Sequence, residues 1–170
     1  MSIQVRRTRR LSRLQNVQLF GEGYTVFGID GPNLRWRPPR WRFLAFEDGK
    51  LVAHAGVLRQ TIGVGGNPLR VAGFAGLVTV AAARGRGLAR LMQDVAADFS
   101  DRRLKADFMA AFCRERLLPF YLGRRWTEVT SPAFIEQPSG TIASPLPVVY
   151  FPLRSMTWPS GTVEIRSLPW

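Results

Sequence analysis

The sequence predicts an α+β fold, in which a mixed, mostly antiparallel sheet is flanked by helices within a single domain spanning residues 1–170. Three observations predict it. A length of 170 residues with 46% hydrophobic residues suffices for one well-buried core. Strand-like runs on both sides of Asp48-Gly49 indicate a hairpin. Apolar residues from Leu88 to Phe99 then recur at helical spacing, so strands and helices alternate along the chain.

The N-terminal forty residues contain one strand, one short helix and a loop. Apolar residues two positions apart predict a strand over Ile3–Thr8. Ser12 and Gln15 form a capping-box pair, which predicts a helix over Arg13–Phe20. Turn-forming residues and three prolines predict a loop from residue 28 to residue 40.

The middle of the chain predicts a β-meander. Arg42–Glu47 and Leu51–Val64 are strand-like, and the Asp-Gly pair between them is the strongest short hairpin signal. A second turn is predicted at Gly65–Pro68, followed by a strand over Leu69–Val80. These runs should form neighbouring antiparallel strands.

The last part of the chain alternates again. A helical pattern starts at Ala83, a short buried strand is predicted at Phe108–Phe112, and Arg116–Leu122 predicts a turn or two of helix. The sequence from Trp126 is mostly extended, with a late strand at Pro147–Phe151.

The charge of the chain is unusual. Lys and Arg number 24 against 12 Asp and Glu, a net charge of +12, and all the basic residues but Lys50 and Lys105 are arginine. A field of this sign attracts nucleic acid, phosphates or an acidic protein and disfavours a polycationic substrate. A solvated basic surface without a partner explains the same number. The single cysteine, Cys113, cannot form an internal disulfide, and no apolar run reaches a membrane-span length, so we expect a cytoplasmic protein that does not enter a membrane.

A glycine-rich turn carries the main functional signal. A buried strand ending at Val80 runs into Arg84-Gly-Arg-Gly87 and directly into the amphipathic helix. Glycines let a ligand approach the backbone, and free N–H groups at a helix N-terminus bind anions, so a phosphate or pyrophosphate site is predicted. The turn lacks the Gly-Lys-Ser/Thr of a P-loop and the third glycine of a dinucleotide fingerprint.

The residues of this turn resemble a known family. Arg84–Ala89 matches the R/Q-x-x-G-x-G/A motif of the GCN5-related N-acetyltransferases (GNAT), and Pro119–Trp126 is similar to the family's F-Y-x-x-x-G-W helix. Arg125 stands where the family has glycine. The resemblance implies a GNAT fold and an N-acyltransferase whose co-substrate is acetyl-CoA or another acyl-CoA, without a metal.

Two groups within the family look nearest. Val52–Val57, Arg70 and Trp126 look like aminoglycoside 2′-N-acetyltransferases, whereas Ala53–Arg59 and Val148–Pro152 look like nodulation N-acyltransferases. The aminoglycoside enzymes have a strand glutamate where this chain has Ala75, and no run of aspartates follows. Because a polycationic drug needs carboxylates, aminoglycoside modification is disfavoured.

The resemblance also implies a set of site residues. A backbone N–H within Val78–Val80 would polarise the acyl carbonyl, and Tyr121 would be the general acid that protonates the leaving thiolate. The only histidine, His54, is a candidate base, with Glu115 and water as alternatives and a structural role for the imidazole also open. The residues assigned to the acyl-CoA are Val78, Thr79, Val80, Arg84, Gly85, Arg86, Gly87, Leu88 and Ala89.

The acceptor is expected to be the primary amine of a small molecule, attacked directly in a ternary complex. Trp36, Ala75 and Trp170 are the residues assigned to its binding, Trp170 in this chain or in a homodimer partner. Three alternatives stay open: a donor carried by an acidic acyl carrier protein, an inactive acyl-CoA-binding relative, and a basic nucleic-acid-binding module suggested by Arg35-Trp-Arg and Arg40-Trp-Arg.

Overall fold

A computed structural model of the chain describes residues 2–22 and 33–170. The predicted loop over 28–40 therefore lies partly outside the described residues, and its described part, 33–40, has no helix or strand. The elements follow the chain as β1 (Ile3–Thr8), α1 (Arg13–Phe20), β2 (Trp41–Glu47), β3 (Lys50–Val64), β4 (Asn67–Thr79), η1 (Ala81–Ala83), α2 (Leu88–Arg102), β5 (Phe108–Phe112), η2 (Glu115–Leu117), α3 (Leu118–Leu122), β6 (Thr127–Glu128), β7 (Ala133–Gln137), β8 (Gly140–Ala143), β9 (Val148–Pro152) and β10 (Val163–Ile165).

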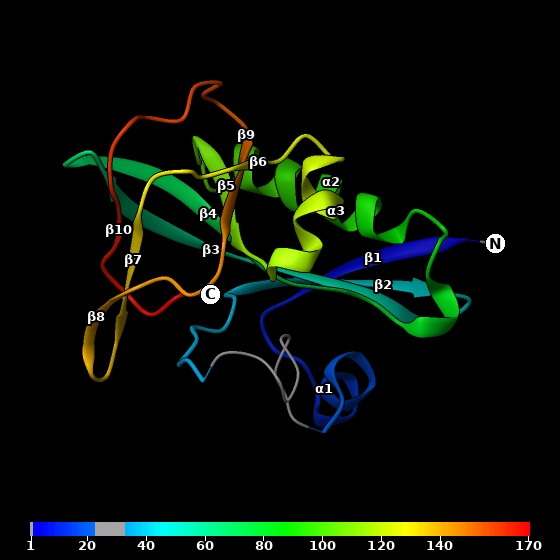
Figure 1. Cartoon of the computed structure of the whole chain (residues 1–170). Helices are drawn as coiled ribbons and strands as arrows, with labels where there is room; N and C mark the ends of the chain where they lie inside the picture. Colours follow the sequence, from blue (N-terminus) through cyan, green and yellow to red (C-terminus); the bar gives the residue numbers. More distant parts are fainter. Residues whose placement is uncertain (1, 23–32) are drawn as a thin grey trace.

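The strands form one mixed sheet in the order β6-β9-β5-β4-β3-β10-β7-β8, with β2 pairing to β3 and β1 pairing to β2 (Figure 1). Most neighbours are antiparallel, and the parallel pairs are β4 with β5 and β7 with β10. The fifteen-residue strand β3 pairs with β2 along its first half and with β10 at its end. The predicted α+β fold with a mostly antiparallel mixed sheet is confirmed.

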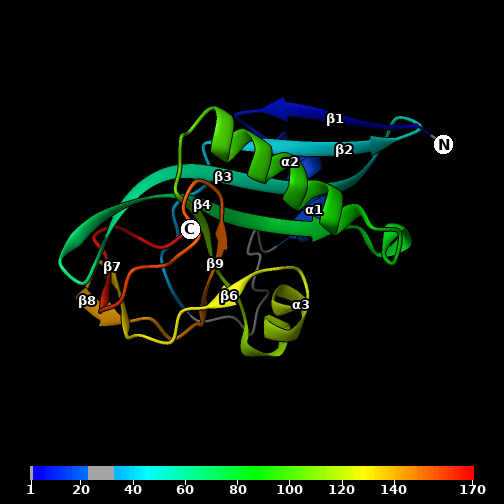
Figure 2. The same ribbon diagram turned by 90° about the horizontal axis from the view of Figure 1, so that it is seen from above.

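The helices cover both faces of this sheet. Helix α2 lies across β3 and β4, with α3 on the same side, whereas α1 lies below the opposite face (Figures 1 and 2). One core cluster, which includes Phe74 and Met92, packs between the sheet and α2. A second cluster, which includes Leu58 and Trp170, contains apolar residues of β3, β4 and β5 and of the C-terminal strands. The two clusters therefore lie on opposite faces of the sheet.

The N-terminal predictions agree closely with the structure. The capping box is present: Ser12 Oγ accepts from the Gln15 N–H at 3.1 Å, and Gln15 Oε1 accepts from the Ser12 N–H at 2.9 Å. Helix α1 has the predicted bounds, Arg13–Phe20. Local side-chain chemistry therefore fixes the start of this helix, as the sequence indicates.

The start of helix α2 differs from the prediction. The helical pattern begins at Ala83, but Ala81–Ala83 form a 3-10 turn and α2 begins at Leu88. Gly85 and Gly87 have φ of +77°, a left-handed conformation that interrupts a right-handed helix. The glycine turn is thus a separate segment between β4 and α2.

Strand β4 contains an irregularity that shapes the site. His54 pairs with Val78 and Gly56 pairs with Ala75, so β4 has one residue more than β3 over this stretch. Gly76, in the extra stretch, has φ of +62°. Beyond Gly73, whose partner is Ala110, β4 is no longer paired with the parallel strand β5. One edge of β4 near its end is therefore open.

Candidate active site

A cavity of about 670 Å³ lies between the end of β4, the start of α2 and helix α3. The strand contributes backbone and side chains, the glycine turn contributes the helix N-terminus, and η2 and α3 contribute an apolar wall with one phenol. The lining residues are Leu77, Val78, Thr79, Ala83, Arg84, Gly85, Gly87, Leu88, Ala89, Arg90, Leu117, Phe120, Tyr121 and Arg124. None of them is acidic.

The glycine turn leaves its backbone accessible. A Cβ built on Gly85 or on Gly87 meets no atom within 4 Å, so both glycines face open space in the cavity wall. Gly87 is also the N-cap of α2, and no side chain caps the helix there. The N–H groups of the first turn of α2 thus have no capping side chain, which suits an anionic group.

Three arginines give the cavity its positive charge. Arg84 is fixed by its Nε, which donates to the Thr79 carbonyl oxygen at 3.3 Å. Arg124 donates from Nη1 to the Phe120 carbonyl oxygen at 3.0 Å, and its guanidinium carbon lies 3.8 Å from the centre of the Phe120 ring. Arg90 lies in the first turn of α2. Of these three, only Arg84 is predicted from the sequence as a site residue, although the other two lie three positions after Gly87 and after Tyr121, a spacing that offered a signal for them.

Two of the residues assigned to the acyl-CoA do not line this cavity. Arg86 turns toward β2, where Nη1 and Nη2 donate to both carboxylate oxygens of Glu47 at 3.0 and 2.8 Å. The Val80 N–H donates to the Val52 carbonyl oxygen at 3.0 Å, which is the β3 side of the strand. Side-chain or N–H contact of these two with a ligand stays a prediction, whereas the other seven assigned residues line the cavity.

Among the residues that the structure describes, Tyr121 is the only titratable group other than arginine in the cavity wall. Its side chain is buried between Phe120 and Trp126, whose ring centres lie 5.2 and 5.3 Å away. Burial raises the pKa of Tyr121 above its ordinary value, and the neighbouring Cys113 raises it further. The phenol is therefore fully protonated at neutral pH.

His54 lies on the side of the sheet that faces α1, fully buried. Its Nδ1 lies 2.6 Å from the Gly76 carbonyl oxygen, its Nε2 lies 3.3 Å from Arg42 Nη1, and its ring packs edge-on against Phe20. Since Arg42 can only donate, Nε2 accepts and Nδ1 carries the proton. Burial lowers the pKa of His54 to about 4, which keeps the ring neutral. Both nitrogens are occupied by protein groups, so the ring positions the backbone around Gly76.

The three residues assigned to the acceptor gather in one place. Trp36, Ala75 and Trp170 all pack in the second core cluster, in which the Trp36 and Trp170 rings both lie edge-on against Phe112. The Trp170 Nε1 donates to the Ala110 carbonyl oxygen at 2.9 Å, and the indole lies against Gly73. They are therefore on the side of β4 opposite Phe74 and Trp126. Acceptor binding by this group stays a prediction.

Glu115 and Cys113 do not line the cavity. Glu115 is exposed at the start of η2, ahead of α3, and forms no ion pair with another described residue. Burial raises the pKa of Cys113 to about 11, so its thiol is not a thiolate. Within residues 2–22 and 33–170, no three His, Cys, Asp or Glu side chains gather in a group that could hold a metal ion. No helix in those ranges is long and apolar enough to span a membrane.

Comparison with known proteins shows the family of the chain. The family model for the acetyltransferase (GNAT) domain matches residues 26–124, which include the glycine turn, β5 and Tyr121. This match covers more than half of the chain, so the chain belongs to the GNAT family. No curated protein is significantly similar to it in sequence. Family membership makes it an acyl-CoA-dependent N-acyltransferase in general terms.

Solved structures share the fold at low sequence identity. ElaA of Escherichia coli is 16% identical over 87% of this chain and 99% of its own, with a TM-score of 0.55. An acyl-CoA N-acyltransferase from Pseudomonas aeruginosa is 17% identical over 88% and 99%, also with a TM-score of 0.55. A further match, to a GCN5-related N-acetyltransferase from Kribbella flavida, is 22% identical over 51% of this chain and 21% of that longer protein, and its TM-score of 0.46 is too low to show a shared fold.

Proposed function

We propose that this chain transfers an acyl group, in the first instance acetyl, from an acyl-CoA to the primary amine of a small molecule. The observation that carries the proposal is the cavity in which a glycine turn, a helix N-terminus, an open strand edge and one protonated phenol meet. Each of these features corresponds to one requirement of the reaction: holding a polyanionic donor, polarising a carbonyl and protonating a thiolate.

The donor's diphosphate fits the glycine turn. Gly85 and Gly87 leave space for close approach to the backbone, and Arg84, Arg90 and Arg124 supply positive charge around the first turn of α2. The buried Thr79 hydroxyl has no hydrogen-bond partner among the described residues, and it lines the same cavity. A polar part of the acyl-CoA lying along β4 would supply the hydrogen-bond partner that this hydroxyl lacks.

The strand edge offers the group that polarises the carbonyl. Successive N–H groups along a strand point to opposite edges. Because the Val80 N–H points to β3, the Thr79 N–H points to the edge that β5 has left. A backbone N–H held there donates to the oxygen on which charge develops as the amine attacks.

Tyr121 is proposed as the general acid. The amine nitrogen forms a bond to the acyl carbon, the carbon–sulfur bond breaks, and the electron pair leaves with the sulfur. Tyr121 Oη–H donates its proton to this thiolate and is reprotonated from solvent. Water takes the proton that the amine loses, since no carboxylate lines the cavity and both nitrogens of His54 are occupied.

A transfer assay tests the proposal. Purified protein is mixed with acetyl-CoA, octanoyl-CoA or an acetylated acyl carrier protein and a panel of small primary amines, and thiol release is followed together with the mass of the amine. Amine-dependent thiol release from an acyl-CoA, with a product that is heavier by the acyl group, supports it. Thiol release only from the carrier protein shows that the carrier protein is the donor, and binding of acyl-CoA without thiol release under any condition shows that the chain is a binding protein.

The cytoplasmic location and the homodimer remain predictions.

A further inference from the structure

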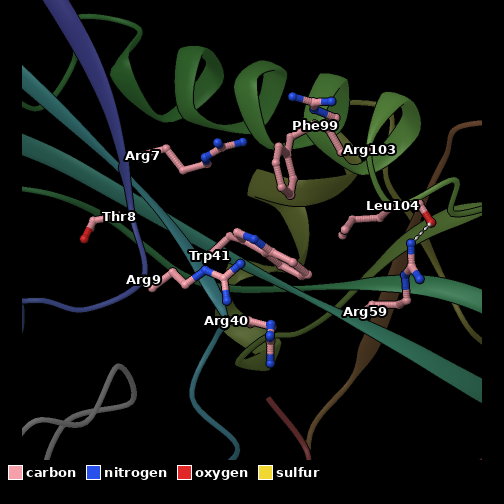
Figure 3. Close-up of a pocket in the computed structure, with 9 residues that line it drawn as sticks. All are labelled: Arg7, Thr8, Arg9, Arg40, Trp41, Arg59, Phe99, Arg103 and Leu104. Carbon is pink, nitrogen blue, oxygen red and sulfur yellow. Dashed lines mark hydrogen bonds between the residues drawn. The ribbon is translucent and has the colours of Figure 1, made fainter.

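A second cavity, of about 760 Å³, lies at the other end of α2 (Figure 3). It is built from segments far apart in the sequence: the end of β1, the start of β2, the middle of β3 and the C-terminal end of α2. The lining residues are Arg7, Thr8, Arg9, Arg40, Trp41, Arg59, Phe99, Arg103 and Leu104. None of them lines the proposed acyl-CoA cavity.

The charge of this cavity has one sign. Five of the nine lining residues are arginine and none is acidic. Within the described part of the chain, none of these five forms an ion pair with a carboxylate. Elsewhere five other arginines do: Arg70, Arg86, Arg102, Arg154 and Arg166. Bringing like charges together around a hollow is unfavourable unless an anion neutralises them.

The arginines surround two aromatic side chains of the cavity lining, Trp41 and Phe99. Trp41 and Phe99 lie with ring centres 5.4 Å apart. The guanidinium carbons of Arg9 and Arg40 are 5.9 and 5.6 Å from the Trp41 ring centre, and that of Arg7 is 5.3 Å from the Phe99 ring centre. Figure 3 shows the three side chains around the two rings. A planar ring of a ligand could pack against these aromatic rings and guanidinium groups, and an anionic group attached to that ring could pair with the arginines.

One arginine of the rim is held in place by the backbone. Arg59 Nη2 donates to the Leu104 carbonyl oxygen at 3.2 Å, just beyond the end of α2. This contact limits the orientations that the Arg59 guanidinium can take. Arg103, at the same end of the helix, also lines the cavity. Arginine forks suit phosphate oxygens because they donate two parallel hydrogen bonds.

The distance between the cavities shows that they are separate sites. Helix α2 has fifteen residues, and at ~1.5 Å per residue it is roughly 22 Å long. The glycine turn lies at its N-terminal end and the arginine cavity at its C-terminal end. The diphosphate of a donor held at the turn therefore does not reach these arginines.

We propose that the arginine cavity binds a small, multiply phosphorylated ligand that carries an aromatic ring, that is, a nucleotide. Ligand cavities of about 300–1,000 Å³ hold molecules of this size. The nucleotide would use four residues that the acyltransferase function leaves unused: Arg7 and Arg9 of the N-terminal basic segment, and Arg40 and Trp41. Their side chains line one cavity of about 760 Å³, a volume that suits a compact ligand.

Calorimetric titration with ATP and with inorganic tripolyphosphate, with and without saturating CoA, tests this. The variant Arg7→Gln/Arg103→Gln removes two charges from the cavity. The matched control Arg6→Gln/Arg13→Gln removes the same charge from the other side, because Arg6 lies over Phe46 and Arg13 belongs to α1. We expect ATP to bind in the presence of CoA, to bind tighter than tripolyphosphate, and to bind at least tenfold more weakly to the cavity variant than to the control.

Other outcomes overturn the proposal in defined ways. Equal weakening in both variants shows a general charge effect, and loss of ATP binding on adding CoA places ATP in the acyl-CoA cavity. Equal affinity for ATP and for tripolyphosphate contradicts a contribution of the aromatic ring of the ligand to binding. Tighter binding of a single-stranded RNA dodecamer, lost in both variants, makes the surface a nucleic-acid interface. Should the double variant fail to fold, the exposed single variant Arg40→Gln is compared with the single variant Arg13→Gln, which also removes one charge.

Discussion

The imidazole of His54 donates a hydrogen bond from Nδ1 to the carbonyl oxygen of Gly76, over a distance of 2.6 Å. This contact joins β3 to the point where β4 carries its extra residue. The next residues of β4, Leu77–Thr79, line the proposed acyl-CoA cavity. The buried histidine thus helps to set the position of the strand edge on which the proposed chemistry depends.

The protonation of His54 should make stability depend on pH. Its pKa is about 4 in the folded protein and about 6.5 in the unfolded chain. The unfolded state therefore binds a proton first, so stability is full above pH 6.5 and falls as the pH drops toward 4. The difference amounts to roughly 3 kcal/mol. Urea denaturation at several pH values, compared with His54→Gln, measures it. The same pH slope in both proteins would contradict this assignment.

Removing the Tyr121 hydroxyl should slow turnover without weakening donor binding. If Tyr121 protonates the thiolate, Tyr121→Phe lowers kcat by about 10²-fold and leaves the KM for the acyl donor nearly unchanged. Tyr150→Phe is the control, because Tyr150 stacks on Trp158 and does not line the cavity. Steady-state kinetics on both variants decides. Equal kcat in Tyr121→Phe and the unmodified protein would assign the proton to another group.

Arg125 should be a site where glycine stabilises the protein. Its φ is +69°, which costs a residue with a side chain roughly 1–2 kcal/mol. Arg125→Gly relieves this strain at the cost of added flexibility in the unfolded chain, so we expect a gain of about 1 kcal/mol. The midpoint of urea unfolding measures it. A loss of stability would show that the Arg125 contact with Phe151 outweighs the strain.

The last residue of the chain should be structural. Trp170 is 4% exposed, packs on Phe112 and donates to the Ala110 carbonyl. Trp170→Ala should therefore lower the free energy of unfolding by about 3–5 kcal/mol. Met156→Ala, at a side chain that is 73% exposed, should change it by less than about 0.5 kcal/mol. Thermal unfolding of the two variants compares them, and a stable Trp170→Ala protein would refute this role.

Local signals predicted much of the fold. The capping box fixes α1, the Asp48-Gly49 turn fixes the first hairpin, and the apolar spacing from Leu88 identifies α2. The short strands β6, β7, β8 and β10 were expected only as extended chain, because two to five residues carry no clear period and their pairing is long-range.

The parts of the candidate active site that lie within one short segment of the chain could be predicted from the sequence. The glycine turn and Tyr121 each lie within a recognisable local pattern, and both line the cavity. The partner of Arg86 is Glu47, thirty-nine positions away, and no local pattern indicates such a pairing. The arginine cavity draws on β1, β2, β3 and α2, so only the folded chain brings it together.

The central claim, that the glycine turn binds the acyl donor, is tested most directly by calorimetric titration with acetyl-CoA. Gly87→Phe places a side chain in the cavity wall, and Gly49→Phe is matched to it, since Gly49 also has open space and a φ of +79° but lies in the β2–β3 turn. We predict saturable micromolar binding to the unmodified protein and to Gly49→Phe, and none to Gly87→Phe. Equal binding to both variants would contradict the account.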